Sequence, residues 1–209
     1  MRSMFPVAVA FSVLAFPSAG TAQPVVYTLV ELGPADASQT FGFGINDSGV
    51  AAGLATVDGH DTRAVRTVDD VFTIPPGLDR SSYALAINAN GDLAGSITIT
   101  PWPALEYHAM RYTDAGGVED LGAAFSGGRA EATAINRYGQ VAGWFAYGSG
   151  SHAFVSGPSG LRDVGTLGGA DGVANAINDA GTVVGVAVST AGDHYVAVRW
   201  PADGYGAGP

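Results

Sequence analysis

The sequence predicts an all-β fold, a β-propeller-like array of four repeats with four strands each. One motif recurs four times at spacings of 42, 48 and 42 residues, which lie in the range of propeller blades. Glycine makes up 31 of the 209 residues and separates short apolar runs, as turns between strands require. No segment beyond the first 22 residues has the period of a helix. The copies read GINDSGVAAG from Gly44, AINANGDLAG from Ala86, AINRYGQVAG from Ala134 and AINDAGTVVG from Ala176.

Residues 1–22 are predicted to be a secretory signal peptide. Arg2 supplies a positive charge, an apolar run follows over Phe5–Phe16, and small residues suit cleavage after Ala22. The apolar run is too short to span a membrane. We therefore expect a secreted or periplasmic protein with a single repeat domain over residues 23–209 and no membrane span after cleavage.

The composition restricts both the stabilising forces and the partners of the chain. It contains no cysteine, so disulfides and thiol chemistry are excluded and packing must stabilise the fold. The formal net charge of −10 argues against nucleic acid and anionic membrane surfaces, because both attract basic patches. The sequence implies no cofactor.

Turn chemistry explains the Ile-Asn-x-x-Gly core of the motif. Asparagine at the first position of a type I turn can accept a hydrogen bond from the backbone two residues ahead. Glycine at the fourth position adopts the left-handed conformation that closes a hairpin with a bulge. The sequence therefore predicts four tight hairpin turns, at Asn46–Gly49, Asn88–Gly91, Asn136–Gly139 and Asn178–Gly181.

Other strands also recur in each unit. A strand is predicted to open the first unit at Tyr27–Gly33 (YTLVELG), with counterparts at Val118–Gly122 (VEDLG) and Leu161–Gly165 (LRDVG) and a weaker one in VFTIPPGLD. Each unit ends in a strand with alanine before an apolar residue, as in RAVR, HAMRY, HAFV and VAVRW. These boundaries give units of about 27–70, 71–116, 117–160 and 161–200.

The repeats are expected to pack on one another. A single unit cannot bury both faces of its sheet, so its neighbours must supply the core. Alanine or glycine stands one and three residues before each Ile-Asn pair and would let adjacent sheets approach closely. These features favour a four-bladed propeller. A β-solenoid, whose rungs are shorter, and an incomplete propeller are the alternatives, since the chain ends soon after Trp200 and leaves ring closure open.

In combination these motifs resemble a known family. SHAFV (Ser151–Val155), DVGTLGG (Asp163–Gly169) and the four hairpins are similar to the HAF-repeat family of extracellular bacterial proteins, over about Tyr27 to Trp200. His-Ala-Phe is complete only at His152–Phe154. The resemblance implies a secreted, propeller-like repeat protein and supplies no catalytic residues.

Four histidines, one in each unit, raise the question of a metal site: His60, His108, His152 and His194. If these segments are strands, the last three share a face and His60 points away from it. Zinc requires ligands that converge at about 2.0–2.1 Å, which histidines spread over four blades do not favour. No metal is expected, and His108, His152 and His194 are kept as weak candidates.

In three units an arginine stands two residues after the alanine of the last strand. Acidic residues also recur, two residues before the glycine that ends the YTLVELG, VEDLG and LRDVG segments. One hypothesis is a cluster that binds an anionic ligand. The other, which we favour, is ion pairing between blades, worth about 0–1 kcal/mol for each exposed pair. The arginines are Arg66, Arg111 and Arg199, and the acids are Glu31, Asp120 and Asp163.

Aromatic residues gather in two segments of the middle units that are predicted to be surface loops. Trp102 lies in PWPALEY, and Trp144 and Tyr147 lie in WFAYGSG. Exposed tryptophan and tyrosine can stack on sugar faces or anchor a partner protein. The alternative is that they form half-buried lids over the blade ends.

The predicted function is a secreted binding module for a glycan or for an envelope or extracellular protein. Trp102, Trp144, Tyr147 and the three arginines are the candidate binding residues. Catalysis is not favoured, because the sequence holds no nucleophile elbow, HExxH helix or phosphate-binding loop. The alternatives are a propeller hydrolase or lyase with a site in the central channel, and a structural envelope repeat.

Overall fold

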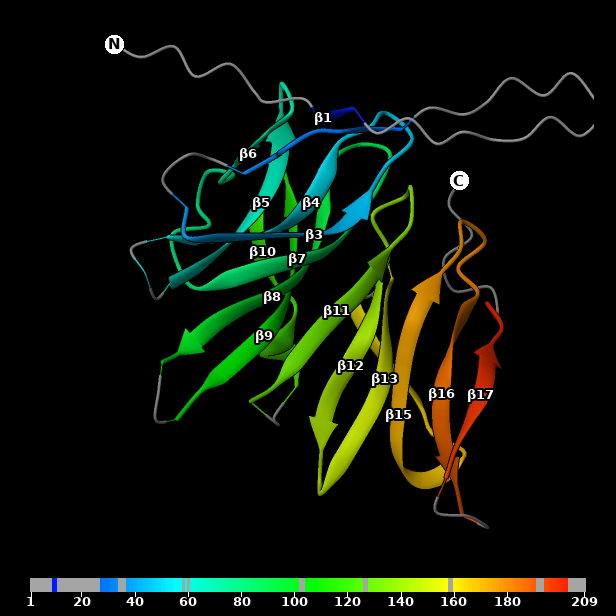
Figure 1. The fold of residues 1–209 in the computed structure, drawn as a ribbon. Helices are drawn as coiled ribbons and strands as arrows, with labels where there is room; N and C mark the ends of the chain where they lie inside the picture. Colours follow the sequence, from blue (N-terminus) through cyan, green and yellow to red (C-terminus); the bar gives the residue numbers. More distant parts are fainter. Residues whose placement is uncertain are drawn as a thin grey trace, which may run out of the picture.

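Figure 1 shows a computed structural model of the chain, which is all-β as predicted. The structure describes residues 9–10, 27–33, 37–57, 59, 61–101, 104–125, 128–157, 160–190 and 194–202. Within these residues the helical content is one 3-10 turn at Gly122–Ala124, and no helix is long and apolar enough to cross a membrane.

Four successive groups of antiparallel strands, which we call sheets, carry the repeats (Figure 1). The third and fourth are joined in one seven-stranded sheet through β13 and β15. The first contains β3 (Gln39–Ile45), β4 (Ala51–Val57), β5 (Asp61–Val68) and β6 (Val71–Thr73). The second contains β7 (Ser82–Ile87), β8 (Leu93–Thr100), β9 (Glu106–Thr113) and β10 (Gly117–Asp120). The third contains β11 (Ala130–Ile135), β12 (Val141–Tyr147), β13 (Gly150–Gly157) and β14 (Gly160–Gly165). The fourth contains β15 (Gly168–Ile177), β16 (Val183–Ser189) and β17 (Tyr195–Trp200), and β1 (Val9–Ala10) pairs separately with β2 (Thr28–Leu29).

In the first three sheets, the fourth strand comes from a segment that was predicted to open the next unit. β6, β10 and β14 pair with the strand before them, because short turns join each pair as a hairpin. Between β5 and β6, Asp69 and Asp70 have positive φ values of 51° and 61°, as the tightest hairpin turns require. The sheets are therefore offset by one strand from the predicted units, and the described part of the fourth sheet has three strands.

The sheets form a row with the first and fourth at its two ends (Figure 1). The first strand of each sheet lies against the sheet before it, since β7 contacts β3–β5, β11 contacts β7–β9 and β15 contacts β11–β13. A single parallel bridge between Ser151 and Asp171 also joins the third and fourth sheets. The structure thus has the packing between neighbours that the repeats predict, and closure into a four-bladed propeller stays a prediction.

Small residues of one sheet meet larger apolar residues of the next. Ala52 and Ala64 of the first sheet are fully buried in one cluster with Ile87, Leu93 and Met110 of the second. The alanines let the sheets approach, and the larger side chains fill the space between them. Equivalent residues repeat this packing at the next two interfaces. They are Ala94, Ala109, Ile135, Val141 and Phe154 at the second, and Ala142, Ala153, Ile177 and Val183 at the third.

The final glycine of each motif is required by a β-bulge. In all four sheets the register of the first strand shifts by one residue just before the Ile-Asn pair. The bulge brings the two backbones so close that a Cβ on this glycine would lie 1.8 to 2.0 Å from a carbonyl oxygen of the partner strand. Only glycine therefore fits at Gly53, Gly95, Gly143 and Gly185.

Candidate functional site

The four Asn-x-x-Gly turns have the geometry that the sequence predicts. In each turn the glycine N–H donates to the asparagine carbonyl oxygen at 2.9 to 3.1 Å, and the glycine φ lies between 76° and 85°. The asparagine Oδ1 accepts a backbone N–H from four residues ahead in all four turns, and from two residues ahead in three of them. The predicted turn chemistry is confirmed.

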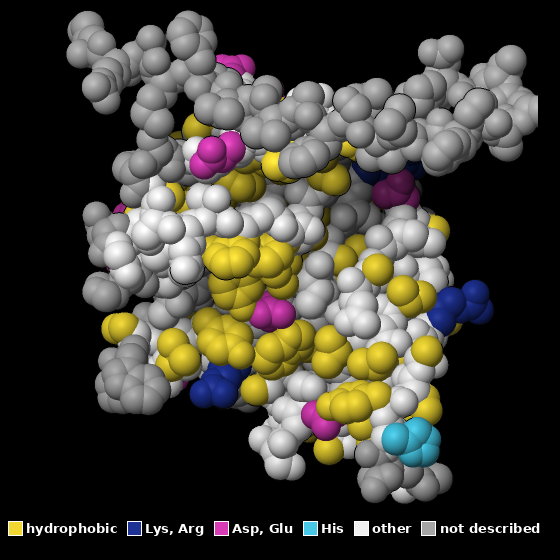
Figure 2. All heavy atoms as spheres, viewed as in Figure 1, with side chains coloured by type: hydrophobic (Ala, Val, Ile, Leu, Met, Phe, Trp, Pro, Cys, Tyr) yellow, Lys and Arg dark blue, Asp and Glu magenta, His cyan; other side chains and the backbone are white. Residues whose placement is uncertain are grey.

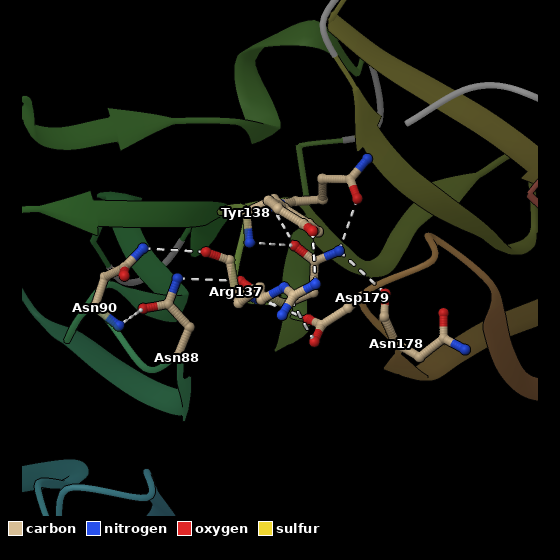
Figure 3. Close-up of polar contacts among 8 residues, drawn as sticks. Asn88, Asn90, Arg137, Tyr138, Asn178 and Asp179 are labelled. Carbon is tan, nitrogen blue, oxygen red and sulfur yellow. Dashed lines mark hydrogen bonds and ion pairs between the residues drawn. The ribbon is translucent and has the colours of Figure 1, made fainter. Parts of the chain in front are cut away.

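The asparagine amides also connect the sheets, which the sequence analysis did not foresee. Nδ2 of Asn46 donates to the carbonyl oxygen of Asn88 at 3.0 Å, and Asn88 donates to Asn136 at 3.0 Å. Asn136 donates in turn to Asn178 at 3.1 Å (Figure 3). We call these four residues the asparagine ladder. Because each Oδ1, and the Nδ2 of Asn46, Asn88 and Asn136, already has a protein partner, the recurrence of asparagine needs no bound cation.

Neighbouring side chains reinforce the ladder between the third and fourth sheets (Figure 3). The backbone N–H of Arg137 donates to Asp179 at 3.1 Å, and its guanidinium forms an ion pair with the same carboxylate at 3.4 Å. The guanidinium also lies 4.7 Å from the centre of the Tyr138 ring. Asn90 Nδ2 donates to the Arg137 carbonyl oxygen at 3.0 Å. These groups bind one another, which favours a structural role for this edge.

Two of the three predicted arginines bridge neighbouring sheets. Arg66 donates to the carbonyl oxygen of Gly91 at 3.0 Å and forms an ion pair with Asp114 at 2.6 Å. This guanidinium holds the pKa of Asp114 below its usual range. Arg111 repeats the contact, with the carbonyl oxygen of the turn glycine of the third sheet at 2.6 Å. Arg199, on the last strand, is exposed.

The histidines and aspartates that recur in the second and third units form pairs within sheets. Nδ1 of His108 lies 2.8 Å from Asp120, and Nδ1 of His152 lies 2.8 Å from Asp163, each across adjacent strands. His194 is exposed, and His60 lies outside the described residues. The described residues contain no group of three or more metal-ligating side chains, so the weak metal candidates are not brought together.

Trp144 belongs to a cluster at the junction of the second and third sheets, at the opposite end of the strands from the ladder. Its Nε1 donates to Glu131 Oε1 at 3.3 Å, and the Tyr83 hydroxyl donates a short hydrogen bond to Oε2 of the same carboxylate. The ring of Tyr107 meets Trp144 edge-on at 6.3 Å, and Arg129 lies 5.9 Å from the centre of the Tyr107 ring. We call these five residues the Glu131 cluster.

Strand pairing and repeat packing build this cluster. Glu131 on β11 is directly opposite Trp144 on β12. Tyr83 occupies the same position in β7 as Glu131 does in β11, so the packing of these strands brings the two side chains together. The prediction that Trp144 and Tyr147 lie in a loop is wrong, because the WFAY segment is the second half of strand β12, in which Phe145 is buried and its neighbours Trp144 and Ala146 are half-buried.

Burial and the Glu131 carboxylate act on both phenols of the cluster. Partial burial raises the pKa of Tyr83, and the hydrogen bond to Glu131 raises it further. Burial and the charge of Glu131 also raise the pKa of Tyr107, partly opposed by Arg129. Both hydroxyls therefore stay protonated at neutral pH and can donate hydrogen bonds.

Aromatic side chains are also exposed on β3 and at the end of β12. The rings of Phe41 and Phe43 on β3 stack at 6.4 Å and are about half exposed. Figure 2 shows hydrophobic side chains gathered over the middle of this face of the molecule. Tyr147 is 57% exposed and stacks on His152 at 4.2 Å. Trp102 lies outside the described residues.

Sequence reasoning missed Tyr83, Tyr107, Arg129 and Glu131. A signal was present at Glu131, because the other repeats have Phe41, Tyr83 and Val173 at this position. A charged residue in an otherwise apolar repeat position indicates a local role.

A cavity of about 200 Å³ opens at the seam between the third and fourth sheets. Val155 and Gly181 line it. At the two earlier junctions between sheets, the residue in the position of Val155 is an arginine, and it donates to the carbonyl oxygen of the turn glycine that corresponds to Gly181. Arg162, Asp163 and Trp200 also line it. The change from arginine to valine therefore leaves open a space that the earlier seams fill.

Comparison of the chain with protein-family models, curated proteins and solved structures finds no match. The similarity to HAF repeats thus stays a prediction from the motifs.

Proposed function

We propose that the chain is a secreted, β-propeller-like protein of the HAF-repeat type that binds a glycan, or an envelope or extracellular protein, through the Glu131 cluster. The observation that carries the proposal is the convergence of Tyr83 and Trp144 on the two oxygens of Glu131. The cluster contains one of the candidate binding residues, Trp144, and adds four residues to it.

The chemistry of the cluster suits a sugar. Aromatic rings stack on the apolar faces of sugars, and carboxylate, phenol and guanidinium groups form hydrogen bonds with hydroxyls. Tyr83, Tyr107 and Trp144 are partly exposed, and Arg129 is exposed, so these groups are within reach of a ligand. The hydrogen bonds to Glu131 fix its orientation before binding, which lowers the entropic cost of recognition.

Binding is favoured over the hydrolase alternative by the number of acids. Glycoside hydrolysis ordinarily uses a pair of carboxylates on either side of the scissile bond. The described cluster has one, Glu131, and both of its oxygens already accept hydrogen bonds. The cluster is therefore better suited to hold a ligand than to cleave it.

The test is a glycan array probed with the purified protein, followed by calorimetric titration of the best ligand. Trp144→Ala and Glu131→Gln should each weaken binding at least tenfold, and Trp102→Ala tests the candidate binding residue that lies outside the described residues. Tyr138→Ala is the matched control, because Tyr138 is a 44% exposed aromatic residue on the ladder edge. Circular dichroism checks that each variant is folded.

Unchanged affinity in both Trp144→Ala and Glu131→Gln would remove the cluster from the proposal. If the array gives no ligand, the same variants are compared in pull-downs from envelope extracts, where loss of a specific partner in both variants but not in Tyr138→Ala supports a protein ligand.

A further inference from the structure

The fourth sheet leaves uncovered a face that the other sheets bury. We use "outgoing face" for the side of each sheet that packs on the next sheet. One alanine of the outgoing face, seven residues after the isoleucine of the motif, is fully buried in the first three sheets. These alanines are Ala52, Ala94 and Ala142. The equivalent Val184 is 44% exposed, and Ala197 on β17 is exposed, although its equivalents in the other sheets are fully buried.

Two hydrogen-bonding features of the fourth sheet also have no counterpart among the described residues. The outer edge of β17 has no fourth strand, whereas β6, β10 and β14 cover this edge in the other sheets. Asn178, at the end of the asparagine ladder, is exposed, and its Nδ2 donates to no described residue. An unpaired strand edge is a template for pairing with another strand.

At the other end of the row, Tyr27–Gly33 has the sequence and position of a fourth strand. Its Glu-Leu-Gly ending matches the Asp-Leu-Gly that follows β10. Leu32 packs on the side of the first sheet that is opposite its outgoing face, and Leu121 packs on the same side of the third sheet. Leu29 and Val30 are 66% and 45% exposed, so the segment has apolar side chains without a full set of neighbours.

We propose that the Tyr27–Gly33 segment of one copy pairs with the free edge of β17 in a second copy and joins the copies head to tail. By repeat equivalence, the registers of β9 with β10 and of β13 with β14 place Leu29 opposite Trp200 and Val30 opposite Arg199. The first sheet of one copy then covers the outgoing face of the fourth sheet of the other. This interface continues the packing that joins the sheets within one chain.

The core and the ladder supply two further matches. Ile45 is 71% exposed, whereas Ile87 and Ile135 are 9% exposed because they pack on the sheet before them. On the outgoing face of a second copy, Ile45 meets Val184 and Ala197, in the positions where Ile87 meets Ala52 and Ala64. The carbonyl oxygen of Asn46 then takes the position in front of Asn178 Nδ2 that Asn88 takes in front of Asn46.

The geometry favours a second copy over closure within one chain. Tyr27–Gly33 lies beside the first sheet, whereas β17 lies at the far end of the row (Figure 1). The strand partner of β2 is β1, which belongs to the predicted signal peptide, so cleavage of that peptide would free Thr28 and Leu29 to pair with another strand while Leu32 stays hydrogen-bonded to Phe72. A contact between two different surfaces can repeat, so the copies would form a ring or a linear chain.

The first test measures self-association of the purified protein by sedimentation velocity over a series of concentrations. Dimers and larger species should form as the concentration rises. Ile45→Arg on one surface and Val184→Arg on the other should each weaken association at least tenfold. Leu105→Arg is the matched control, because Leu105 is 39% exposed on the turn between β8 and β9 of the second sheet, and this variant should associate like the unmodified protein.

Mixing the two variants distinguishes a head-to-tail contact from a symmetric one. Ile45→Arg keeps an intact fourth sheet and Val184→Arg keeps an intact first sheet, so their equimolar mixture should form dimers and nothing larger. A monomeric unmodified protein, association that survives both variants, or a mixture that stays monomeric would overturn the proposal.

The second test uses the absence of cysteine from the chain. Opposed residues in paired strands have Cα atoms about 4.5–5.5 Å apart, within the range of a disulfide. Val30→Cys combined with Arg199→Cys should therefore give disulfide-linked dimers and longer species on a non-reducing gel. Val71→Cys with Arg199→Cys is the control and should keep its thiols. A monomer with an internal disulfide would show closure within one chain, and free thiols would show no pairing; either result overturns the proposal.

Discussion

Asn88 and Asn136 stand 48 residues apart in the sequence and are joined by a hydrogen bond of 3.0 Å from Nδ2 of the first to the carbonyl oxygen of the second. Asn88 Oδ1 meanwhile accepts two backbone N–H groups of its own turn. One side chain therefore fixes the turn with its oxygen and the next sheet with its nitrogen. This double role explains why the repeats contain asparagine here and not aspartate, which could only accept.

Asn136→Asp tests the contribution of the ladder nitrogen. The carboxylate keeps the acceptor for the turn but loses the donor to Asn178, in a residue that is 4% exposed. A buried charge next to a carbonyl oxygen should lower the free energy of unfolding by about 2–4 kcal/mol, measured by urea denaturation at neutral pH. The matched variant Asn178→Asp should cost less than about 1 kcal/mol, because Asn178 is exposed. Equal losses in the two variants would contradict a structural role for the ladder.

Gly95→Ala tests the close backbone contact at the bulge. A Cβ at this position would lie 1.9 Å from the Tyr83 carbonyl oxygen, so the two strands must separate. We expect the variant to lose about 2–4 kcal/mol of unfolding free energy or to fail to fold. Gly42→Ala is the control, because its Cβ would meet nothing nearer than 3.9 Å and the other repeats have alanine there. Thermal denaturation should show the control unchanged or slightly more stable.

The sequence was sufficient for features that local chemistry determines. The Asn-x-x-Gly turns follow from backbone geometry, and the period-two strands beside them follow from alternation, so both were predictable. The boundaries of the sheets were not, because VFT, VED and LRDV can pair with the strand before or after them. The short turn at Asp69 and Asp70 decides this, and a sequence of two aspartates is a weak signal for it.

The candidate site was predictable only in part. Trp144 was selected for its residue type, but its neighbours Tyr83 and Glu131 come from different repeats and meet because β7 and β11 pack together. Such a contact depends on which faces of successive sheets are opposed, and a single repeat does not encode it. The arginine register, in contrast, was visible in the sequence, but its expected partners were not found: Arg66 forms an ion pair between sheets with Asp114, and Arg111 pairs with Glu119 of its own sheet. The expected acids Asp120 and Asp163 pair with histidines instead.

Arg66→Ala and Arg199→Ala distinguish structural arginines from free ones. Arg66 bonds to Gly91 and Asp114 and lies 5.7 Å from the centre of the Tyr112 ring, so its loss should cost about 1–2 kcal/mol. Arg199 is exposed and forms no contact of this kind among the described residues, so its loss should change stability by less than about 0.5 kcal/mol. Chemical denaturation at low and high salt measures both. An equal effect of the two substitutions would contradict the assignment.

Alkaline titration tests the link between Tyr83 and Glu131. The pKa of Tyr83 is raised in the folded protein, so between the ordinary value of about 10 and the folded value the unfolded chain binds fewer protons. The contribution of this group to the free energy of unfolding should therefore be constant with pH below pH 10 and should fall as the pH rises above it. The slope from Tyr83 is at most about 1.4 kcal/mol per pH unit, and less because the side chain is partly exposed.

Tyr83→Phe should be less stable at pH 8, because it loses the hydrogen bond, but should lose stability more slowly above pH 10. Absorbance at 295 nm should show one fewer late-titrating tyrosine in the variant, and an identical titration curve would show that Glu131 does not hold the Tyr83 proton.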